Sequence, residues 1–380
     1  MKLFYISSQF VEERQPAGMI QMLYTAREFR RSLGDNFSFI VRGVSDKAIM
    51  NAWELPYKVS SCPFRARILF YIFWLPIFWV KQNRLSSKEV LARQGKILYC
   101  LDWHAAIAGI LYKKIFGYKI AIEYHDPPFG SWKDRVIVRF CDYLLPTTYA
   151  LKNYLSRIDE KTKQKSWVIP NGIDLEKFAN TFSKEECRKK LGLDQNKKIV
   201  LYSGNFVARK GIYVLAKAAE FLPDDMLLVM IGGHDPDSIS EFKQKIVEKG
   251  NIFVGGYKPH DEIPLWIGAS DVCVAPNSKS TETEQGRAAI DWTSPMKVFE
   301  YMAAKRPIVC SDIPAMREIL DSETVIFVEP DNPKALADGI KEALMSREKA
   351  DRLVKNAFER VSRNTWEKRS VNILKIFENK

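Results

Sequence analysis

A serine, a proline and one carboxylate stand close together in a stretch that reads as the start of a helix. Ser294 has the residue type of an N-cap, and Pro295 suits the first helical position. The backbone amides just after them, at Met296 and Lys297, have no partners within a helix, so they can hold a phosphate. Glu300 follows among apolar neighbours, where a carboxylate suits the hydroxyls of a ribose. The alternative is a solvated helix residue without a ligand.

A glycine turn with two cations follows an apolar, strand-like segment. It reads Gly204-Asn205-Phe-Val-Ala-Arg209-Lys210-Gly211. A helix that begins after this turn presents free N–H groups and a positive dipole, and Lys210 adds a charge that can reach a diphosphate. A solvated basic pair is the alternative. Neither this turn nor the one after the first strand has the spacing G-x-G-x-x-G, so a nicotinamide dehydrogenase is not expected.

Two of the four histidines follow neighbouring strand-like segments. His125 and Asp126 come directly after one apolar segment, and Asp102 and His104 come after the one before it. The carboxyl ends of parallel strands meet at one edge of a sheet, where ligands bind. This equivalent placement favours a site over two structural histidines.

The sequence offers no strong metal site. Asp235-Pro-Asp237 has the D-x-D spacing of metal-dependent sugar transferases, but the match is short and lies in a loop, where Asp and Pro are common. The six cysteines are scattered and show no C-x-x-C pair, which argues against zinc and against a secreted disulfide framework. The first residues read as a strand rather than a signal peptide. We therefore expect no metal, no cofactor and a reducing compartment.

These residues need sheets to position them. A chain of 380 residues is long for one domain and comfortable for two. Strand and helix patterns alternate in both halves, which indicates an α/β protein with two Rossmann-like, doubly wound domains facing a central cleft. The turn chemistry of Asn171-Gly172 marks the seam. The predicted strands are 3–7, 37–42, 97–101, 119–124, 143–147, 167–170, 198–203, 226–232, 252–255, 272–276, 308–311 and 325–328.

The positive charge of the chain belongs to its first half. The net charge is +12, and residues 1–180 contribute 27 Lys and Arg against 16 Asp and Glu. Residues 181–380 contribute 31 against 30, which is nearly balanced. A one-sided positive field points to an anionic partner such as a membrane surface, an acidic glycan or a nucleic acid. Basicity without a partner is the alternative.

An apolar run at Ile68–Val80 lies between basic flanks at residues 65–67 and 81–84. A transmembrane helix needs about 17–25 residues, and this run is shorter and interrupted by Pro76. Two interpretations stay open. The segment is a core or interface helix of the first domain, or it places aromatic side chains in an anionic bilayer surface, with residues 65–84 meeting the headgroups.

Four segments together resemble the glycosyltransferases of family 4, which have the GT-B fold. They are VIPNGIDLEKF at 168–178, LYSGNFVARKG at 201–211, ASDVCVAP at 269–276 and SPMKVFEYMAAKRPIVCSD at 294–312. The resemblance covers essentially the whole chain. It implies an N-terminal acceptor-side domain at 1–172, a nucleotide-sugar-binding domain at 173–362, and a C-terminal helix at 363–380 that crosses back to the first domain.

The resemblance also implies roles for the candidate residues. Glu300 binds the ribose of a nucleotide-sugar, and Lys210 and the backbone of 294–297 hold its diphosphate. His125 lies near the donor sugar, and Gly18, in a glycine loop after the first strand, allows a close approach. The catalytic candidates are His125, Lys210 and Glu300. The donor contacts are Gly18, Gly204, Asn205, Arg209, Lys210, Ser294, Pro295, Met296, Lys297 and Glu300, and the acceptor or sugar contacts are Asp102, His104, Asp126 and Asp291.

Two positions depart from the family pattern. The family often has two glutamates seven residues apart, but Trp292 stands at the first position and Asp291 is the nearest acid. The family also often has arginine where this chain has Asn205. The loop at 277–293 is long and polar, and we expect it to become ordered on donor binding.

The resemblance therefore implies a retaining, metal-independent glycosyltransferase. It moves a sugar from a nucleotide-diphosphate sugar, a UDP-sugar rather than a GDP-sugar, to a glycan or lipid-linked acceptor of cell-surface polysaccharide or glycolipid synthesis. We expect a cytoplasmic protein, peripheral at the inner membrane face through residues 65–84, and no nucleic-acid partner. The alternatives are a GT-B-fold epimerase or phosphorylase and a non-catalytic nucleotide-sugar-binding protein.

Overall fold

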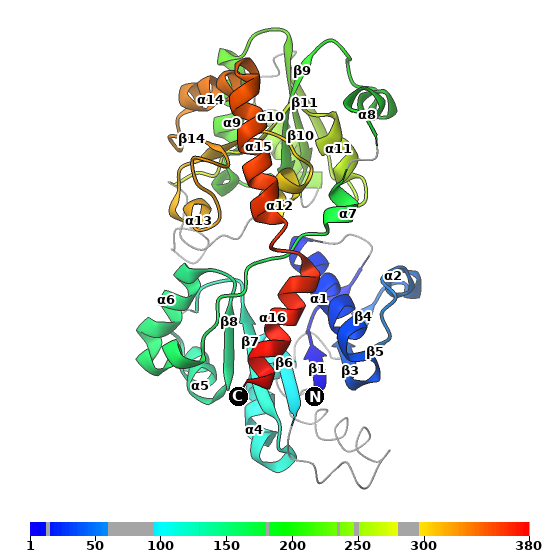
Figure 1. The fold of residues 1–380 in the computed structure, drawn as a ribbon, viewed down its shortest axis with the longest axis vertical. Coiled ribbons are helices and arrows are strands. Elements are labelled where there is room, and N and C mark those ends of the chain that lie inside the picture. The colour runs from blue at the N-terminus through cyan, green and yellow to red at the C-terminus, as the bar shows by residue number, and fades with distance from the viewer. Residues whose placement is uncertain are drawn as a thin grey trace. The chain divides into compact units, whose positions relative to one another are not determined.

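The computed structural model describes residues 1–12, 16–59, 95–128, 130–179, 182–233, 236–246, 251–279 and 296–379. The chain divides into two compact units (Figure 1). The first unit holds Met1–Asn171 and Trp366–Lys380, and the second holds Gly172–Thr365. Each unit is a parallel sheet with helices on both faces, which confirms the predicted class of two Rossmann-like α/β domains.

The sheet of the first unit has six parallel strands in the order β5-β3-β1-β6-β7-β8. Alternate residues of a strand point to opposite faces, so Leu3 and Tyr5 join one core cluster while Phe4 and Ile6 join the other. Helices α1 and α16 cover the first face, and α4, α5 and α6 cover the second. The strands are β1 Lys2–Ile6, β3 Phe37–Val41, β5 Tyr57–Val59, β6 Lys96–Cys100, β7 Lys119–Tyr124 and β8 Tyr143–Pro146. The helices are α1 Ala17–Leu33, α2 Lys47–Ala52, α4 Trp103–Phe116, α5 Trp132–Phe140, α6 Tyr149–Ile158 and α16 Trp366–Glu378, and a small parallel pair is formed by β2 Phe10–Val11 and β4 Gly43–Val44.

The C-terminal helix α16 is fixed to the first unit by stacking and by a buried ion pair. It lies beside α1, and the ring of Trp366 stacks on Tyr24 with centroids 5.3 Å apart (Figure 1). Arg369 is buried and pairs with Glu123 at the end of β7. Its Nη1 also donates to Thr25 Oγ1 at 3.0 Å. Aromatic stacking and a buried charge pair together join the last helix to a strand far away in the sequence.

The sheet of the second unit has the order β11-β10-β9-β12-β13-β14, again all parallel. The chain starts in the middle of the sheet, builds outward to β11, and then crosses to β12. The loops after β9 and β12 therefore leave in opposite directions, and this switch point is where such sheets bind ligands. The strands are β9 Lys198–Gly204, β10 Met226–Gly232, β11 Ile252–Gly256, β12 Val272–Ala275, β13 Ile308–Ser311 and β14 Ile326–Val328. The helices are α7 Leu175–Phe178, α8 Lys184–Leu191, α9 Ile212–Ala218, α10 Pro236–Lys245, α11 Ile263–Ala269, α12 Met296–Ala303, α13 Pro314–Arg317, α14 Pro333–Met345 and α15 Arg347–Val361.

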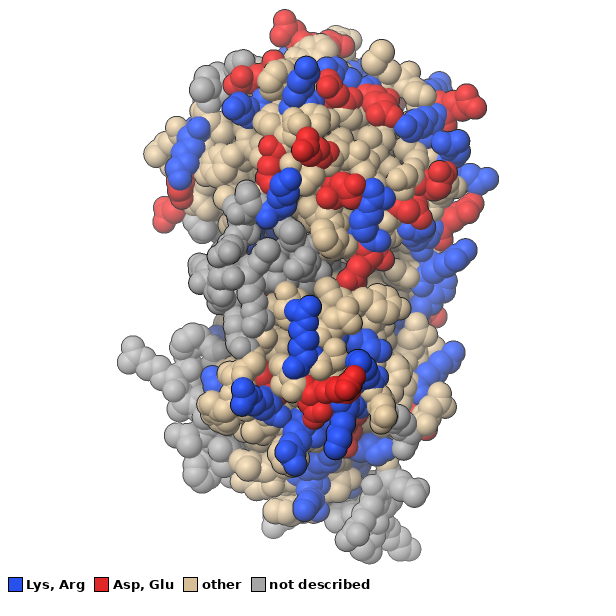
Figure 2. Space-filling model, turned by 90° about the vertical axis from the view of Figure 1, so that its left-hand side faces the viewer, with Lys and Arg blue, Asp and Glu red and all other residues tan. Residues whose placement is uncertain are grey.

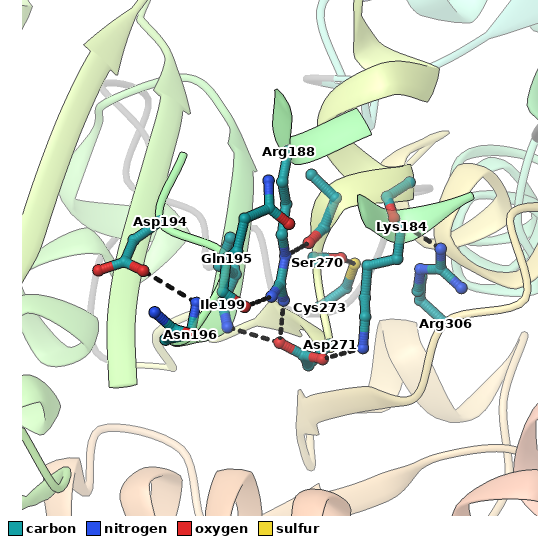
Figure 3. A network of polar contacts seen from close by, with 12 residues as sticks. Lys184, Arg188, Asp194, Gln195, Asn196, Ile199, Ser270, Asp271, Cys273 and Arg306 are labelled. Atoms are coloured by element: carbon teal, nitrogen blue, oxygen red, sulfur yellow. Dashed lines mark hydrogen bonds and ion pairs between the residues drawn. The ribbon is translucent and has the colours of Figure 1, made fainter. Parts of the chain in front are cut away.

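A buried ion-pair network lies at the amino ends of β9 and β12, the edge opposite the switch-point loops (Figure 3). The Asp271 carboxylate accepts from Lys184 Nζ at 2.8 Å, from Arg188 Nη2 at 2.5 Å and from the Ile199 amide at 2.7 Å. Burial raises the pKa of Asp271, but the bonds from Lys184, Ile199 and Arg188 outweigh it and lower the pKa below its usual value. The network ties α8 to two central strands, which is a structural role.

Most predicted elements are confirmed, and β7, β10 and β13 begin and end where the sequence predicts. The predicted strand at 167–170 is wrong. The amides of Trp167 and Ile169 donate to the carbonyls of Leu144 and Pro146 at 3.0 and 2.9 Å, so the segment follows β8 without completing a strand. Among the described helices, none has the length and apolar character needed to cross a bilayer.

Candidate functional site

The loops that leave β9 and β12 are packed directly against each other. Gly211 has φ +72°, and a Cβ built there would lie 1.6 Å from the carbonyl oxygen of Pro276. Only glycine fits this close approach. The Ser278 amide donates to the Arg209 carbonyl at 3.2 Å, which holds the two loops together. The two loops therefore pack together at the carboxyl edge of the second sheet, where the residues predicted to bind a diphosphate lie.

Lys297 places an unpaired amine at this edge. Its side chain comes from the first turn of α12, and the residue is only 9% exposed. Its Nζ has no hydrogen-bond partner among the described residues and lies 4.0 Å from the centroid of the Tyr202 ring. A Cβ built on Gly204 would be 3.6 Å from this amine. Burial, and then the charge of Lys210, lower the pKa of Lys297 well below its usual value.

Arg209 and Lys210 lie in a short 3-10 turn, Ala208–Lys210, rather than at the start of α9 as predicted. The amides of Lys210 and Gly211 donate to the carbonyls of Val207 and Ala208 within this turn, so the side chains supply the positive charge. Lys210 is half-buried. Burial, and then the charge of Arg209, lower its pKa to about 8. Among the described residues, no carboxylate forms an ion pair with either side chain.

Tyrosine hydroxyls fix the end of β9 beside these cations. Tyr202 Oη donates to the carbonyl of Asn205 at 2.8 Å, and the Ser203 amide donates to Tyr301 Oη at 2.9 Å. The second bond joins β9 to α12. Asn205 itself is exposed. The strand end and the helix that carries Lys297 are therefore held in one arrangement.

Glu300 lies on α12, one turn beyond Lys297, and is 7% exposed. Its Oε1 lies 3.2 Å from Nε2 of His260, and its Oε2 has no hydrogen-bond partner among the described residues. Two buried groups of α12, one cation and one carboxylate, thus lie one turn apart.

Sequence reasoning missed His260 and its second partner. His260 is in the turn before α11, and its Nδ1 lies 2.8 Å from Nζ of Lys177 on α7. Lys177 also donates to Asp261 at 2.6 Å. A histidine in a polar turn carries no local pattern, so only the fold could bring it to Glu300.

In the first unit, His125 is held by a buried carboxylate. Its Nε2 lies 3.0 Å from Oε1 of Glu123. The same Oε1 accepts from Gln21 Nε2 at 2.8 Å, and Oε2 of Glu123 accepts from the Tyr99 hydroxyl. Burial raises the pKa of Glu123, but the charge of Arg369, His125 and the Tyr99 bond outweigh it and lower the pKa to about 2. The His125 side chain is 38% exposed, so its outer edge is open to a ligand.

Asp102 supports the fold. Its Oδ1 accepts from the amides of His104 and Ala105 at 3.1 and 3.2 Å and so caps α4, while its Oδ2 accepts from the Ser8 amide at 2.9 Å. His104 Nδ1 lies 3.3 Å from the same carboxylate. Asp126, the other acid predicted here, is exposed. The structure thus gives Asp102 and His104 a capping arrangement that the sequence did not predict.

The prediction that Gly18 lies in a loop is wrong. Gly18 is in the first turn of α1, and a Cβ there would meet nothing within 4 Å. Several other predictions lie outside the described residues: Ser294, Pro295, Asp291, Trp292, Asp235 and the segment 65–84. Within the described ranges, no group of three or more His, Cys, Asp or Glu could hold a metal ion.

Lys and Arg side chains gather on the face of the first unit formed by α5 and α6 (Figure 2). A groove of about 530 Å³ opens there, at the amino ends of β7 and β8. Lys113 Nζ donates to the Phe140 carbonyl at 3.0 Å, and Lys165 Nζ donates to the Cys141 carbonyl at 2.8 Å. These two lysines therefore cap the last carbonyls of α5. The groove lies at the sheet edge opposite His125.

The sequence and the fold of this chain are similar to those of known proteins. Residues 183–360 match the family described as glycosyl transferases group 1. The chain is 29% identical over 189 residues to a putative teichuronic acid biosynthesis glycosyltransferase, TuaC of Bacillus subtilis, a match that covers 48% of this chain and 44% of that protein. It is 26% identical over 287 residues to a lipopolysaccharide core biosynthesis mannosyltransferase, LpsB of Rhizobium meliloti, covering 70% and 75%. The structure of Anabaena HepE in complex with UDP and glucose is similar over 100% of both chains, with a TM-score of 0.76 and 16% identity, which shows the shared fold.

Proposed function

Since the chain belongs to the GT-B-fold glycosyltransferases and carries a group 1 domain at residues 183–360, we propose that it transfers a sugar from a nucleotide-diphosphate sugar to a glycan or lipid-linked acceptor. The observation that carries this proposal is the amine of Lys297, which is buried beside a second cation, Lys210, and has no acceptor within the part of the chain that the structure describes. Burying an uncompensated cation costs free energy, and an anion that fills the site repays that cost. A diphosphate supplies charge for both amines.

The proposed reaction breaks the bond between the anomeric carbon of the sugar and the diphosphate oxygen. A bond forms to the acceptor oxygen, and the acceptor proton leaves with the diphosphate. Negative charge grows on the leaving diphosphate, where Lys210 and Lys297 stabilise it. These amines supply charge that a metal supplies in other transferases, so the proposed reaction needs no metal.

Retention of configuration is the second part of this proposal. The acceptor attacks from the face that the diphosphate leaves, so the new bond keeps the orientation of the old one. We assign His125 to the donor sugar, because its contact with Glu123 orients the ring and its outer edge is exposed. Glu300 accepts from the ribose hydroxyls.

We propose a UDP-sugar as the donor and an anionic or lipid-linked glycan as the acceptor. HepE was solved with UDP and glucose, and a second structure of it with UDP-glucose. TuaC and LpsB are named for teichuronic acid and lipopolysaccharide core synthesis. The excess of Lys and Arg in residues 1–180 supports an anionic acceptor, used at the inner membrane face by a peripheral protein with residues 65–84 at the lipid surface.

Thermal unfolding with a panel of UDP-, GDP-, ADP- and dTDP-sugars tests the donor. A ligand at about 100 times its Kd adds about 2.7 kcal/mol to the unfolding free energy, and we expect this for a UDP-sugar. Release of UDP is then followed with membrane extract as acceptor, with and without a metal chelator, and we expect turnover in both. Stabilisation by none of the sugars would refute the donor site. Stabilisation without turnover would identify a non-catalytic nucleotide-sugar-binding protein.

A further inference from the structure

A chain of polar contacts runs from the surface of the second unit to Glu300. Asp261, which is exposed, accepts from Lys177 Nζ at 2.6 Å. The same Nζ lies 2.8 Å from His260 Nδ1, and His260 Nε2 lies 3.2 Å from Glu300 Oε1. The side chains of His260 and Glu300 are 13% and 9% exposed. These contacts join three elements, which are α7, the turn before α11, and helix α12.

The contacts fix the proton positions on the imidazole. A lysine ammonium has three donors and no acceptor, so Nδ1 of His260 must accept from Lys177. The neutral ring then carries its proton on Nε2, which donates to the Glu300 carboxylate. The bond from Lys177 also lowers the pKa of Asp261 below its usual value.

These contacts engage only one of the two carboxylate oxygens of Glu300. Oε1 receives the imidazole N–H, while Oε2 has no partner among the described residues. A carboxylate held at one oxygen cannot rotate freely about its last torsion, so the other oxygen keeps one direction. A residue that orients a ligand-binding side chain in this way reduces the conformational entropy that this side chain loses when the ligand binds.

We propose that His260, itself oriented by Lys177, is a positioning residue that fixes the Glu300 carboxylate for the ribose of the donor. This inference rests on the proposed function, because it assigns the ribose to Glu300. It adds that a histidine and a lysine outside the nucleotide contacts set the nucleotide affinity through the orientation of Glu300.

The test measures UDP affinity by calorimetry on the full chain. His260→Ala removes the donor and should weaken UDP binding about tenfold. His260→Gln places an amide N–H where Nε2 was and should restore most of the affinity. Lys177→Met removes the ammonium that orients the imidazole, so it should also weaken UDP binding, by less than His260→Ala does.

Lys258→Met is the matched control, because it removes a cation two residues before His260 whose amine lies over the Trp266 ring. Its UDP affinity should equal that of the wild type. If Glu300→Ala weakens UDP binding but His260→Ala and His260→Gln both bind like the wild type, the positioning role is refuted and the proposed function stands. UDP binding by Lys177→Met that equals the wild type would refute the part assigned to Lys177. Unchanged UDP binding in Glu300→Ala, or none in the wild type, would overturn the ribose assignment and this inference with it.

Discussion

Replacing Lys297 by methionine separates a binding role from a packing role, because the two roles predict opposite changes in stability. Methionine keeps the unbranched apolar stem and removes the charge. An unsatisfied buried polar group costs about 1–3 kcal/mol, and the amine of Lys297 has no acceptor among the described residues. Its position over the Tyr202 ring, 4.0 Å from the centroid, returns about 0.5–2 kcal/mol. The ligand-free Lys297→Met protein should therefore be more stable by on the order of 1 kcal/mol.

The same substitution should weaken nucleotide binding. A hydrogen bond to a charged group contributes about 1.5–3 kcal/mol, which corresponds to a loss of about 10-fold to 150-fold in UDP affinity. Unfolding in denaturant gives the stability, and calorimetry gives the affinity. Lys305→Met is the control, because this exposed amine also lies over a ring, that of Phe358 at 4.4 Å, just beyond the same helix. Lower stability with unchanged UDP affinity in Lys297→Met would show a packing role and refute the diphosphate site.

Three further substitutions test contacts that support the fold of each unit. Glu123→Gln leaves Arg369 buried without a counter-charge, and we expect a loss of about 3–5 kcal/mol in denaturant unfolding. Folding lowers the pKa of Glu123 from 4.5 to about 2, so its carboxylate stabilises the fold above about pH 4.5, and this stabilisation is lost as pH falls toward 2. The free energy of unfolding of the Glu123→Gln variant should therefore fall less steeply in acid than that of the wild type. Asp271→Asn should lower stability by about 1–3 kcal/mol without changing UDP affinity, because its network lies at the opposite sheet edge. Gly211→Ala should cost at least about 2 kcal/mol in a thermal melt and abolish UDP binding, because of its positive φ and the overlap with Pro276.

Local sequence patterns predicted most of the fold. Apolar strands such as Met226–Gly232 follow from their residue pattern alone, and the bounds of this strand agree with the structure. The segment 167–170 failed because it has the apolar pattern of a strand, whereas Pro146 of β8 has no backbone N–H to donate back to it. Gly18 failed because glycine after a strand suggests a loop, whereas here it starts a helix.

The candidate site was predicted only where one stretch of chain carries it. Lys297 and Glu300 share a helix, so their spacing was visible in the sequence. The contact of His260 with Glu300 was not visible in the sequence, because its partners Lys177 and Glu300 lie 83 and 40 residues away. The pair of Glu123 and Arg369 spans 246 residues and has no local signature at all. Contacts of this kind depend on how the strands are ordered, which no local pattern encodes.

A crystal structure of the chain bound to UDP tests the central claim most directly. We predict diphosphate oxygens within about 3.2 Å of Nζ of both Lys297 and Lys210, and ribose hydroxyls on the oxygen of Glu300 that His260 leaves open. A diphosphate bound elsewhere, with the amine of Lys297 still without an acceptor, would contradict the account.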